Sequence, residues 1–524
     1  MAREVIEPNA SSASGETLVD ILRVGSHGRM DKVAITSLDR TMSYAELIQE
    51  AADLAATLRD LGGASGARIG YLGRDSTHFV TTLFASAING AVLVPVNWRF
   101  SKEEVEQLVA DAAPSLLLVD EDLFGLVADV GDVEVMAIER LQESIVRSHG
   151  AAELSTYARS ADTAWLIYTS GTTGRPKGVM LTHANTMETI DRVAAAWEIE
   201  ESSVVYVPYP TFHLTGIGWV LKTLRAGGTV VQRSRFDLDD LLEALEVHGV
   251  TNTLLIPTVL ATLINAPGVT PARLSSLRSV VYGVEPMIDA VLERATDLMP
   301  DCRFIHVYGM TESCGQGTYL PWEEQLAEPG RLRSCGRAYP WVEMRVVDPE
   351  TGGDCRAGDT GEVWLRGPNI MAGYFGNEEV TAAALTPDGW LRTGDGGFLD
   401  TDGYLVLTAR LNDMIISGGE NIYPAEVENV LMRHEAVREV GVVGAADDTW
   451  GERVCAFVVR HPSAVATAED LIAYTRQHLA HFKCPSTVLF VDELPKTPTG
   501  KLQRMRLRTD AISHRGLLSP ARVR

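Results

Sequence analysis

Short apolar segments of strand length alternate with segments of helical periodicity from residue 43 to about residue 310. Ser43-Tyr44-Ala45-Glu46 has the spacing of a capping box, and the apolar residues that follow recur at helical intervals up to Gly62. The next predicted elements are a strand at Arg68–Leu72, a helix over Ser76–Asn89 and a buried strand at Ala91–Val96. Such alternation is typical of parallel strands joined by crossover helices, so the sequence predicts an α/β fold with doubly wound parallel sheets.

The pattern changes after Gly315, where short β-rich segments are separated by Gly, Pro and Asp turns. These segments are Glu343–Val347, Gly361–Arg366 and Tyr404–Thr408. We expect them to form a β-barrel-like or antiparallel unit that closes the large domain. Beyond Arg410, helices and strands mix again, at Pro424–Arg433, Val440–Val443, Cys455–Val459 and Ala468–His478. We therefore predict an N-terminal domain over residues 1–409, a hinge over 410–413 and a small, mobile α+β domain over 414–524.

The charge balance restricts the possible partners. The chain has 524 residues, and its 46 Lys and Arg against 70 Asp and Glu give a formal charge of −24 at pH 7. A field of this sign repels nucleic-acid phosphates and anionic lipids, so we expect no nucleic-acid or polybasic membrane role. An anionic ligand would need a few cations gathered locally around it.

Cysteine spacing and hydropathy indicate the compartment. The six cysteines are scattered without a C-x-x-C pair, which favours reduced thiols and a cytoplasmic protein over a disulfide framework or a zinc site. The N-terminal segment carries acidic residues and no apolar core, unlike a secretory signal. Residues 249–272 contain no charged side chain, but asparagines and prolines interrupt them. We expect a buried strand, turn and helix there and no transmembrane segment.

A glycine-rich segment follows the strand-like run Ala164–Tyr168. Residues 168–179 read YTSGTTGRPKGV, with three glycines, four serine or threonine hydroxyls and Lys177. Glycine lets the backbone approach a bound group and point N–H dipoles at it, while the hydroxyls and the lysine add donors, as a polyphosphate requires. The spacing is not that of a Walker A loop. Taken alone, the segment fits a phosphate cradle and a surface turn equally well.

Four further motifs follow in order along the chain. They are Tyr308–Glu312 (YGMTE), Leu391–Asp395 (LRTGD), Arg410 with Asp413–Asn421 (DMIISGGEN), and Pro495–Lys501 (PKTPTGK). With the glycine-rich segment they resemble the motifs of the adenylate-forming superfamily, which includes acyl-CoA synthetases, aryl-CoA ligases, adenylation domains of peptide synthetases and beetle luciferases. The resemblance covers nearly the whole chain. It implies that a carboxylate attacks the α-phosphate of ATP and releases pyrophosphate, so that positioned cations should dominate catalysis.

The resemblance implies a set of site residues. Those expected to bind ATP are Thr169, Ser170, Gly171, Thr172, Thr173, Gly174, Lys177, Glu285, Tyr308, Gly309, Asp395 and Arg410. Those expected to be catalytic are Lys501, Thr311 and Glu312. Lys501 would bridge the acid and the α-phosphate, and the hard carboxylate oxygens of Glu312 would hold Mg²⁺. Tyr308 would stack on adenine, whereas Asp395 and Arg410 would bind the ribose; an acidic residue such as Asp395 is otherwise usually structural beside a glycine turn.

The same resemblance locates the acyl site. It would be lined by His213, Gly283, Val284 and Met310. Amino-acid-activating relatives carry an aspartate in the segment from Val204 to Leu224, and this chain has none, which favours an uncharged, fatty or otherwise apolar acid. His213 fits a tunnel gate, a contact to the substrate carboxylate or a packed core histidine. Val284 stands where many relatives have a small residue, so it would shorten or bend the tunnel.

The acyl acceptor is expected to be coenzyme A. Ser417, Gly418 and Gly419 belong to the turn that lines the pantetheine tunnel in coenzyme A ligases. The two-step reaction requires a rotation at the hinge, where Asn412 replaces the usual lysine or aspartate and puts a charge-based latch in doubt. The sequence therefore predicts an AMP-forming acyl-CoA ligase of fatty acid metabolism that uses ATP, Mg²⁺ and coenzyme A. Loading of a carrier protein and a luciferase-like oxygenase stay open as alternatives, as does a homodimer.

Overall fold

The computed structural model describes residues 15–38, 40–145, 154–170, 176–283, 287, 289–327, 331–410, 413, 415–417, 420–422, 424–447, 451–462, 464–479, 481–496 and 502–513. The chain divides into two compact units. The first comprises Met1–Met344 and Trp364–Arg392, and the second Arg345–Val363 and Thr393–Arg524. The last boundary between the two units, after Arg392, lies before the hinge expected at 410–413, and the position of that hinge stays a prediction.

A nine-stranded sheet forms one half of the first unit, in the order β15-β14-β13-β12-β11-β9-β10-β1-β2. Its strands are β1 (Val33–Thr36), β2 (Thr41–Ser43), β9 (Val204–Val207), β10 (Thr229–Gln232), β11 (Asn252–Leu254), β12 (Ser279–Gly283), β13 (Arg303–Tyr308), β14 (Thr318–Leu320) and β15 (Arg337–Ala338). The six central strands are parallel, whereas β2, β14 and β15 pair antiparallel at the edges. The parallel, buried centre is as predicted, and the antiparallel edges are an addition to it.

A seven-stranded sheet forms the other half, in the order β18-β8-β7-β4-β3-β5-β6. Its strands are β3 (Arg68–Leu72), β4 (Val92–Pro95), β5 (Leu116–Val119), β6 (Glu134–Ala137), β7 (Thr163–Ser170), β8 (Pro176–Thr182) and β18 (Gly373–Tyr374). Strands β7, β4, β3, β5 and β6 are parallel, and β8 and β18 continue the sheet antiparallel. Strand β3 has the bounds that the sequence predicts.

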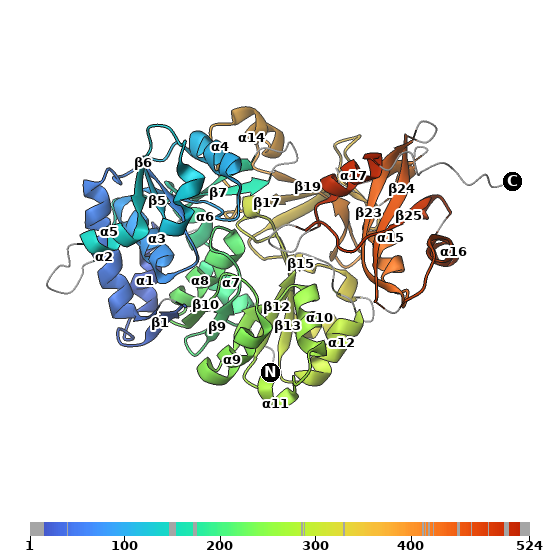
Figure 1. Cartoon of the computed structure of the whole chain (residues 1–524), viewed down its shortest axis with the longest axis horizontal. Coiled ribbons are helices and arrows are strands. Elements are labelled where there is room, and N and C mark those ends of the chain that lie inside the picture. The colour runs from blue at the N-terminus through green and yellow to red at the C-terminus, as the bar shows by residue number, and fades with distance from the viewer. Residues whose placement is uncertain are drawn as a thin grey trace. The chain divides into compact units, whose positions relative to one another are not determined.

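Helices cover both sheets of the first unit (Figure 1). They are α1 (Val19–Gly25), α2 (Tyr44–Asp60), α3 (Thr77–Asn89), α4 (Lys102–Ala112), α5 (Ile138–Ser144), α6 (His183–Met187), α7 (Ile190–Ala196), α8 (Leu214–Arg225), α9 (Leu238–His248), α10 (Pro257–Asn265), α11 (Pro271–Leu274), α12 (Asp289–Leu298), α13 (Trp322–Ala327) and α14 (Glu378–Ala384). The predicted capping box is present, since the Ser43 side chain accepts from Glu46 N–H and the Glu46 carboxylate accepts from Ser43 N–H at 2.7 Å. One core cluster joins α9, α10 and α12 to β9, β12 and β13.

The second unit contains two smaller sheets. One has the order β16-β17-β19-β20, with β16 (Glu343–Val347), β17 (Gly361–Arg366), β19 (Leu391–Leu399) and β20 (Leu405–Arg410). The other has the order β22-β21-β24-β23 with β25 on β24, formed by β21 (Ile415–Ser417), β22 (Glu420–Ile422), β23 (Val437–Asp447), β24 (Gly451–Arg460) and β25 (Thr487–Phe490). Its helices are α15 (Pro424–Leu431), α16 (Ala468–His478) and α17 (Arg504–Ser513). The three predicted short strands correspond to β16, β17 and β20 of the four-stranded sheet, in which β20 pairs antiparallel with β19.

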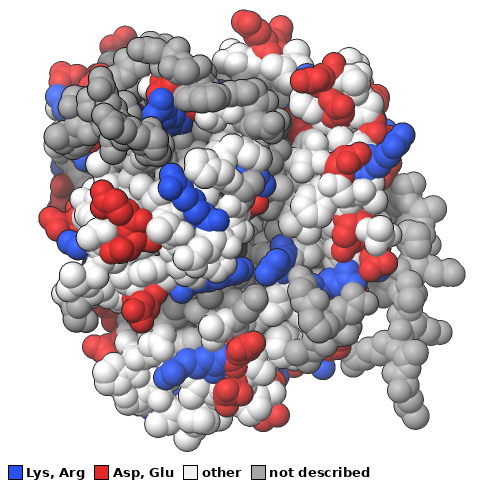
Figure 2. All heavy atoms as spheres, turned by 90° about the vertical axis from the view of Figure 1, so that its right-hand side faces the viewer, with Lys and Arg blue, Asp and Glu red and all other residues white. Residues whose placement is uncertain are grey.

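Residues 249–272 form the predicted strand and helix. They contain β11, α10 and the start of α11, and their apolar side chains join the core cluster of the large sheet. No helix in the described part of the chain is long and apolar enough to cross a membrane. All six cysteines are free thiols. On the face shown in Figure 2, acidic and basic side chains are interspersed. The residues drawn in colour on this face form no continuous basic surface.

Candidate active site

The described residues on either side of the glycine-rich loop pair as two antiparallel strands. Strand β7 runs on through Thr169 and Ser170, strand β8 begins at Pro176, and Thr169 pairs with Lys177 across the hairpin. Gly171, Thr172, Thr173 and Gly174 are outside the described residues. Gly178 packs tightly against Tyr168, since a Cβ there would lie 3.0 Å from the Tyr168 ring. The hairpin therefore holds the two predicted ends of a phosphate loop side by side.

Lys177, Tyr374 and Glu312 form a connected group in the first unit. The Lys177 ammonium lies 5.4 Å from the centroid of the Tyr374 ring, and the Tyr374 hydroxyl donates to Glu312 Oε1 at 2.9 Å. Tyr374 is held there because β18 pairs with β8, with Tyr374 opposite Val179. Within the described part of the chain, neither Lys177 nor Glu312 has an ion-pair partner. The structure thus places a lysine and a buried carboxylate around one tyrosine.

A tight turn presents Glu312. Gly317 N–H donates to Tyr308 O at 2.9 Å, and Gly315 N–H donates to Met310 O at 2.8 Å, so the chain folds back directly after β13. Cys314 has a φ of +52° and Gly315 a φ of +74° within this turn. Asn369, which is fully buried, donates to the carbonyls of Ser313 and Gln316, each at 2.8 Å. These bonds fix the backbone on both sides of Glu312.

Two glycines are required where the predicted acyl and nucleotide motifs meet the sheet. A Cβ on Gly309 would lie 2.4 Å from the carbonyl carbon of Gly315, and one on Gly283 would lie 2.3 Å from Val307 O. Gly283 ends β12 and Tyr308 ends β13, so both motifs leave neighbouring parallel strands at the same edge. Ligands of α/β sheets bind at such carboxyl ends. Val284 and Glu285 are outside the described residues, while Met310 and Thr311 lie in the turn that contains Glu312.

His213 caps the start of α8 and is a neutral side chain. Its ring lies 4.5 Å from that of Phe212, and its Nε2 atom is buried without a hydrogen-bond partner among the described residues. Burial, with a smaller contribution from the positive charge of Arg99, lowers the pKa of His213 to about 4. A neutral imidazole at the helix N-terminus fits an acyl-tunnel wall better than a cationic carboxylate ligand.

A second group of predicted residues lies in the second unit. Asp395 on β19 is paired with Arg410 on β20 in the antiparallel register, which brings the two positions opposite each other. Gly394, with a φ of +70°, donates its N–H to Glu362 at 3.0 Å and so shapes the turn before Asp395. Ser417 ends β21 opposite Glu420. Lys501, Asn412, Gly418 and Gly419 lie outside the described residues.

Two polar side chains of the first unit, Tyr374 and Lys222, were not singled out in the sequence analysis. Tyr374 fell in none of the five motifs, and Lys222 lay in the interval that was searched only for an aspartate. A buried lysine in an apolar helix was the signal that would have found Lys222. Among the described residues there is no cluster of three or more His, Cys, Asp or Glu that would hold a metal. A metal at Glu312 would therefore take most of its ligands from substrate and water.

Comparisons with known proteins agree with this arrangement. The model of the AMP-binding enzyme family matches residues 23–375, and that of the AMP-binding enzyme C-terminal domain matches residues 426–501. The fatty acid–[acyl-carrier-protein] ligase ScoC of Streptomyces coeruleorubidus is 35% identical, over 94% of this chain and 96% of its own length. The indoleacetate–CoA ligase of Aromatoleum aromaticum is 36% identical, over 90% and 94%.

A solved structure shows the same fold. The o-succinylbenzoate CoA synthetase (MenE) from Bacillus subtilis, in complex with the acyl-adenylate intermediate, superimposes with a TM-score of 0.82 at 31% identity. The match covers 93% of this chain and 97% of that chain.

Proposed function

The chain belongs to the AMP-binding enzyme family, and we propose that it is an acid–thiol ligase that adenylates a carboxylic acid with ATP and transfers the acyl group to coenzyme A. Pyrophosphate leaves in the first half-reaction and AMP in the second. The observation that carries the proposal is the group of Lys177, Tyr374 and Glu312, where a lysine and a buried carboxylate stand around one tyrosine.

This group suits the magnesium complex of ATP. Glu312 is only 7% exposed, and among the described residues no cation neutralises it, which is costly unless a bound cation does so. Mg²⁺ would be held there by one carboxylate, phosphate oxygens and water, and it would neutralise the charge that develops on the phosphates. Lys177, on the strand after the glycine-rich loop, would donate to the phosphates. Tyr374, which donates a hydrogen bond to the Glu312 carboxylate, would orient it toward them.

The remaining residues keep the roles that the family resemblance implies. Thr169–Gly174 would surround the phosphates, Tyr308, Gly309 and Glu285 would border the base, and Asp395 with Arg410 would bind the ribose. Lys501 would bridge the acid and the α-phosphate. The β19–β20 pairing supports the Asp395–Arg410 assignment, because it brings the two positions opposite each other.

The acid is proposed to be fatty or aromatic, with an apolar body. Gly283 ends β12 and Met310 follows the end of β13, and no acidic residue in the segment from Val204 to Leu224 would pair with a substrate ammonium. The relatives are named for a fatty acid, indoleacetate and o-succinylbenzoate, which share a carboxylate and a large apolar surface.

The six free thiols support the expected cytoplasmic location.

Coenzyme A is proposed as the acceptor because the Ser417 turn follows the coenzyme A ligase pattern. A carrier protein is the second candidate, since the relative ScoC is named for an acyl carrier protein. Both acceptors carry the same phosphopantetheine thiol, which belongs to a free small molecule in coenzyme A and is attached to a protein in the carrier. Incubation of the preformed acyl-adenylate with free coenzyme A or with a phosphopantetheinylated carrier protein separates them by the product formed.

Adenylation itself is tested by pyrophosphate exchange into ATP with a panel of fatty and aromatic acids. We expect acid-dependent exchange by the wild-type protein and a loss of roughly 10²–10³ in rate in Glu312→Gln, because a positioned charge in the transition state is removed. The matched control is Glu323→Gln, which changes an exposed carboxylate on α13 and should retain full activity. No exchange with any acid of the panel would contradict the proposed function.

A further inference from the structure

Lys222 is a buried cation on the apolar helix α8. Lys222 is only 8% exposed. Its ammonium lies 4.7 Å from the centroid of the Trp197 ring and 3.3 Å from Gly218 O. Among the described residues, no carboxylate pairs with it. A tryptophan face and one carbonyl replace only part of the hydration that an ammonium loses on burial.

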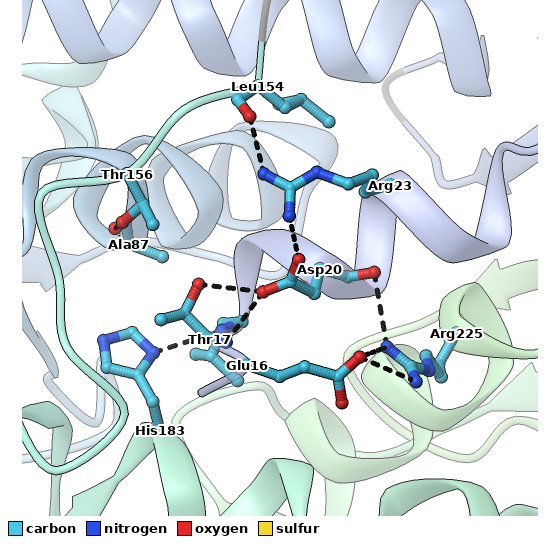
Figure 3. Close-up of polar contacts among 10 residues, drawn as sticks. Glu16, Thr17, Asp20, Arg23, Ala87, Leu154, Thr156, His183 and Arg225 are labelled. Atoms are coloured by element: carbon cyan, nitrogen blue, oxygen red, sulfur yellow. Dashed lines mark hydrogen bonds and ion pairs between the residues drawn. The ribbon is translucent and has the colours of Figure 1, made fainter. Parts of the chain in front are cut away.

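The neighbouring cation on the same helix has the partners that Lys222 lacks. Arg225 is equally buried, yet its guanidinium contacts Asp191 at 2.8 Å and Glu16 at 3.3 Å. Figure 3 shows the Glu16 carboxylate turned toward Arg225. Within the residues that the structure describes, the fold thus supplies counter-charges to one buried cation of α8 and none to the other. A buried charge that the fold leaves uncompensated is a candidate for a ligand partner.

Lys222 also lines a cavity. The largely enclosed space has apolar walls from Trp165 on β7 and Leu214 and Leu221 on α8, and Lys222 is the one charged side chain in its lining. It has room for about one small polar group of the size of a water molecule or a carboxylate oxygen. Space beside a buried, unpaired ammonium therefore exists in the structure itself.

The cavity adjoins the elements assigned to the acyl group. Cys314 and Gln316, which line it, belong to the turn that presents Met310 and Glu312. Leu214, which also lines it, directly follows His213. A substrate ammonium is excluded there, because it would meet the charge of Lys222.

We propose that Lys222 is a specificity-determining residue that binds a second carboxylate at the far end of the acyl group, so that the substrate is a dicarboxylic acid with an apolar body. This inference rests on the proposed function, and it replaces the expectation of an uncharged acyl tail. The carboxylate near the sheet edge is activated, and the distal one stays ionised against the ammonium of Lys222. Pairing a ligand charge with a buried cation gives strong discrimination against acids that lack it.

The test compares matched acids on three proteins. Linear and aromatic diacids of increasing length are assayed beside the monoacid of equal length and the half methyl ester, by pyrophosphate exchange and by calorimetry without ATP. Wild-type protein should prefer the diacid to both matched compounds. Lys222→Met should lose about 100-fold in kcat/KM and in affinity for the diacid while retaining the monoacid rate, and Lys222→Arg should keep part of the preference.

Lys102→Met is the control, because this lysine is on the surface of α4 and should leave the ratio unchanged. A second readout is stability: Lys222→Met should unfold at a higher temperature, since a charge kept for binding is removed from an apolar site. Equal rates for diacid and monoacid in the wild-type protein, or an unchanged ratio in Lys222→Met, would overturn the inference. Diacid binding that depends on Lys222, without pyrophosphate exchange, would support it and contradict the proposed function alone.

Discussion

At the scale of single residues, the hydroxyl of Tyr374 is the contact that orients Glu312. Tyr374→Phe removes the 2.9 Å hydrogen bond and keeps the ring beside Lys177. A hydrogen bond to a charged group contributes about 1.5–3 kcal/mol, so we expect the KM for magnesium ATP to rise about 10- to 100-fold. Titration of Mg²⁺ at fixed ATP should show the same shift, which a purely structural role would not produce.

The control for this variant is Tyr157→Phe, which removes the hydroxyl of an exposed tyrosine beside Arg59. It should leave the Mg²⁺ dependence as in the wild-type protein. If Tyr374→Phe also left that dependence unchanged, Tyr374 would not position the Glu312 carboxylate.

Glu312 and Lys177 were found from the sequence because short motifs contain them, whereas Tyr374 was missed. Tyr374 reaches Glu312 across 62 positions of sequence through the pairing of β18 with β8. Strand β18 has only two residues, too few to show any periodicity. Lys222 was missed for another reason. Only an acidic residue, as a partner for a substrate ammonium, was expected to be informative in this interval, so a cation in it was overlooked. Motifs predict residues, but contacts between distant segments depend on the fold.

At the scale of elements, the turn after β13 depends on the absence of a side chain at Gly309. In Gly309→Ala the new Cβ would lie 2.4 Å from the carbonyl carbon of Gly315, and the backbone rather than a flexible side chain would have to move. Such overpacking costs about 1–3 kcal/mol, and it would displace Glu312. We expect a lower melting temperature and a loss of pyrophosphate exchange larger than the loss of folded protein.

Gly125→Ala is the matched control for this substitution. Gly125 lies in the 3₁₀ helix Glu121–Val127, and nothing stands within 4 Å of a Cβ placed there. Its activity and melting temperature should match the wild-type values. Full activity in Gly309→Ala would show that the turn accommodates the new side chain. The close approach of residue 309 to Gly315 would then not be required at the site.

Element positions were predicted well where local signals define them. The capping box of α2 and the bounds of β3, β16, β17 and α16 agree with the sequence analysis, because caps and apolar runs are local. Strands β23 and β24 are longer than predicted, at 11 and 10 residues, because they stay paired with each other beyond the apolar runs that the sequence shows. The antiparallel direction of β8 and β14 was not predicted, since periodicity indicates a strand but not its partner.

At the scale of the whole molecule, three histidines in the first unit have a lower pKa in the folded protein than in the unfolded chain. Burial is the main cause that lowers the pKa of His183, His213 and His306 to about 4 each, from 6.5 in the unfolded chain. The unfolded state therefore binds more protons between these values. Stability contributed by the neutral rings is complete above pH 6.5 and falls as the pH drops toward about 4.

The predicted result is a free energy of unfolding that decreases by up to about 4 kcal/mol per pH unit in this window, since each proton contributes about 1.4 kcal/mol per unit. Asp75 acts in the opposite direction at the acid end, because burial raises its pKa and protonation relieves that cost. Urea unfolding of the first unit, followed by fluorescence at a series of pH values from about 7.5 to 4.5, measures the slope.

His183→Asn separates this effect from general acid sensitivity. The His183 ring accepts a hydrogen bond from Leu18 N–H at 3.1 Å, and an asparagine oxygen would accept in its place without titrating. We expect lower stability at neutral pH and a pH slope reduced by about one third, because one of three titrating rings is removed. His461→Asn, which changes an exposed histidine, should leave the slope unchanged. A His183→Asn slope equal to that of the wild-type protein would mean that His183 does not enter the native state as a neutral ring.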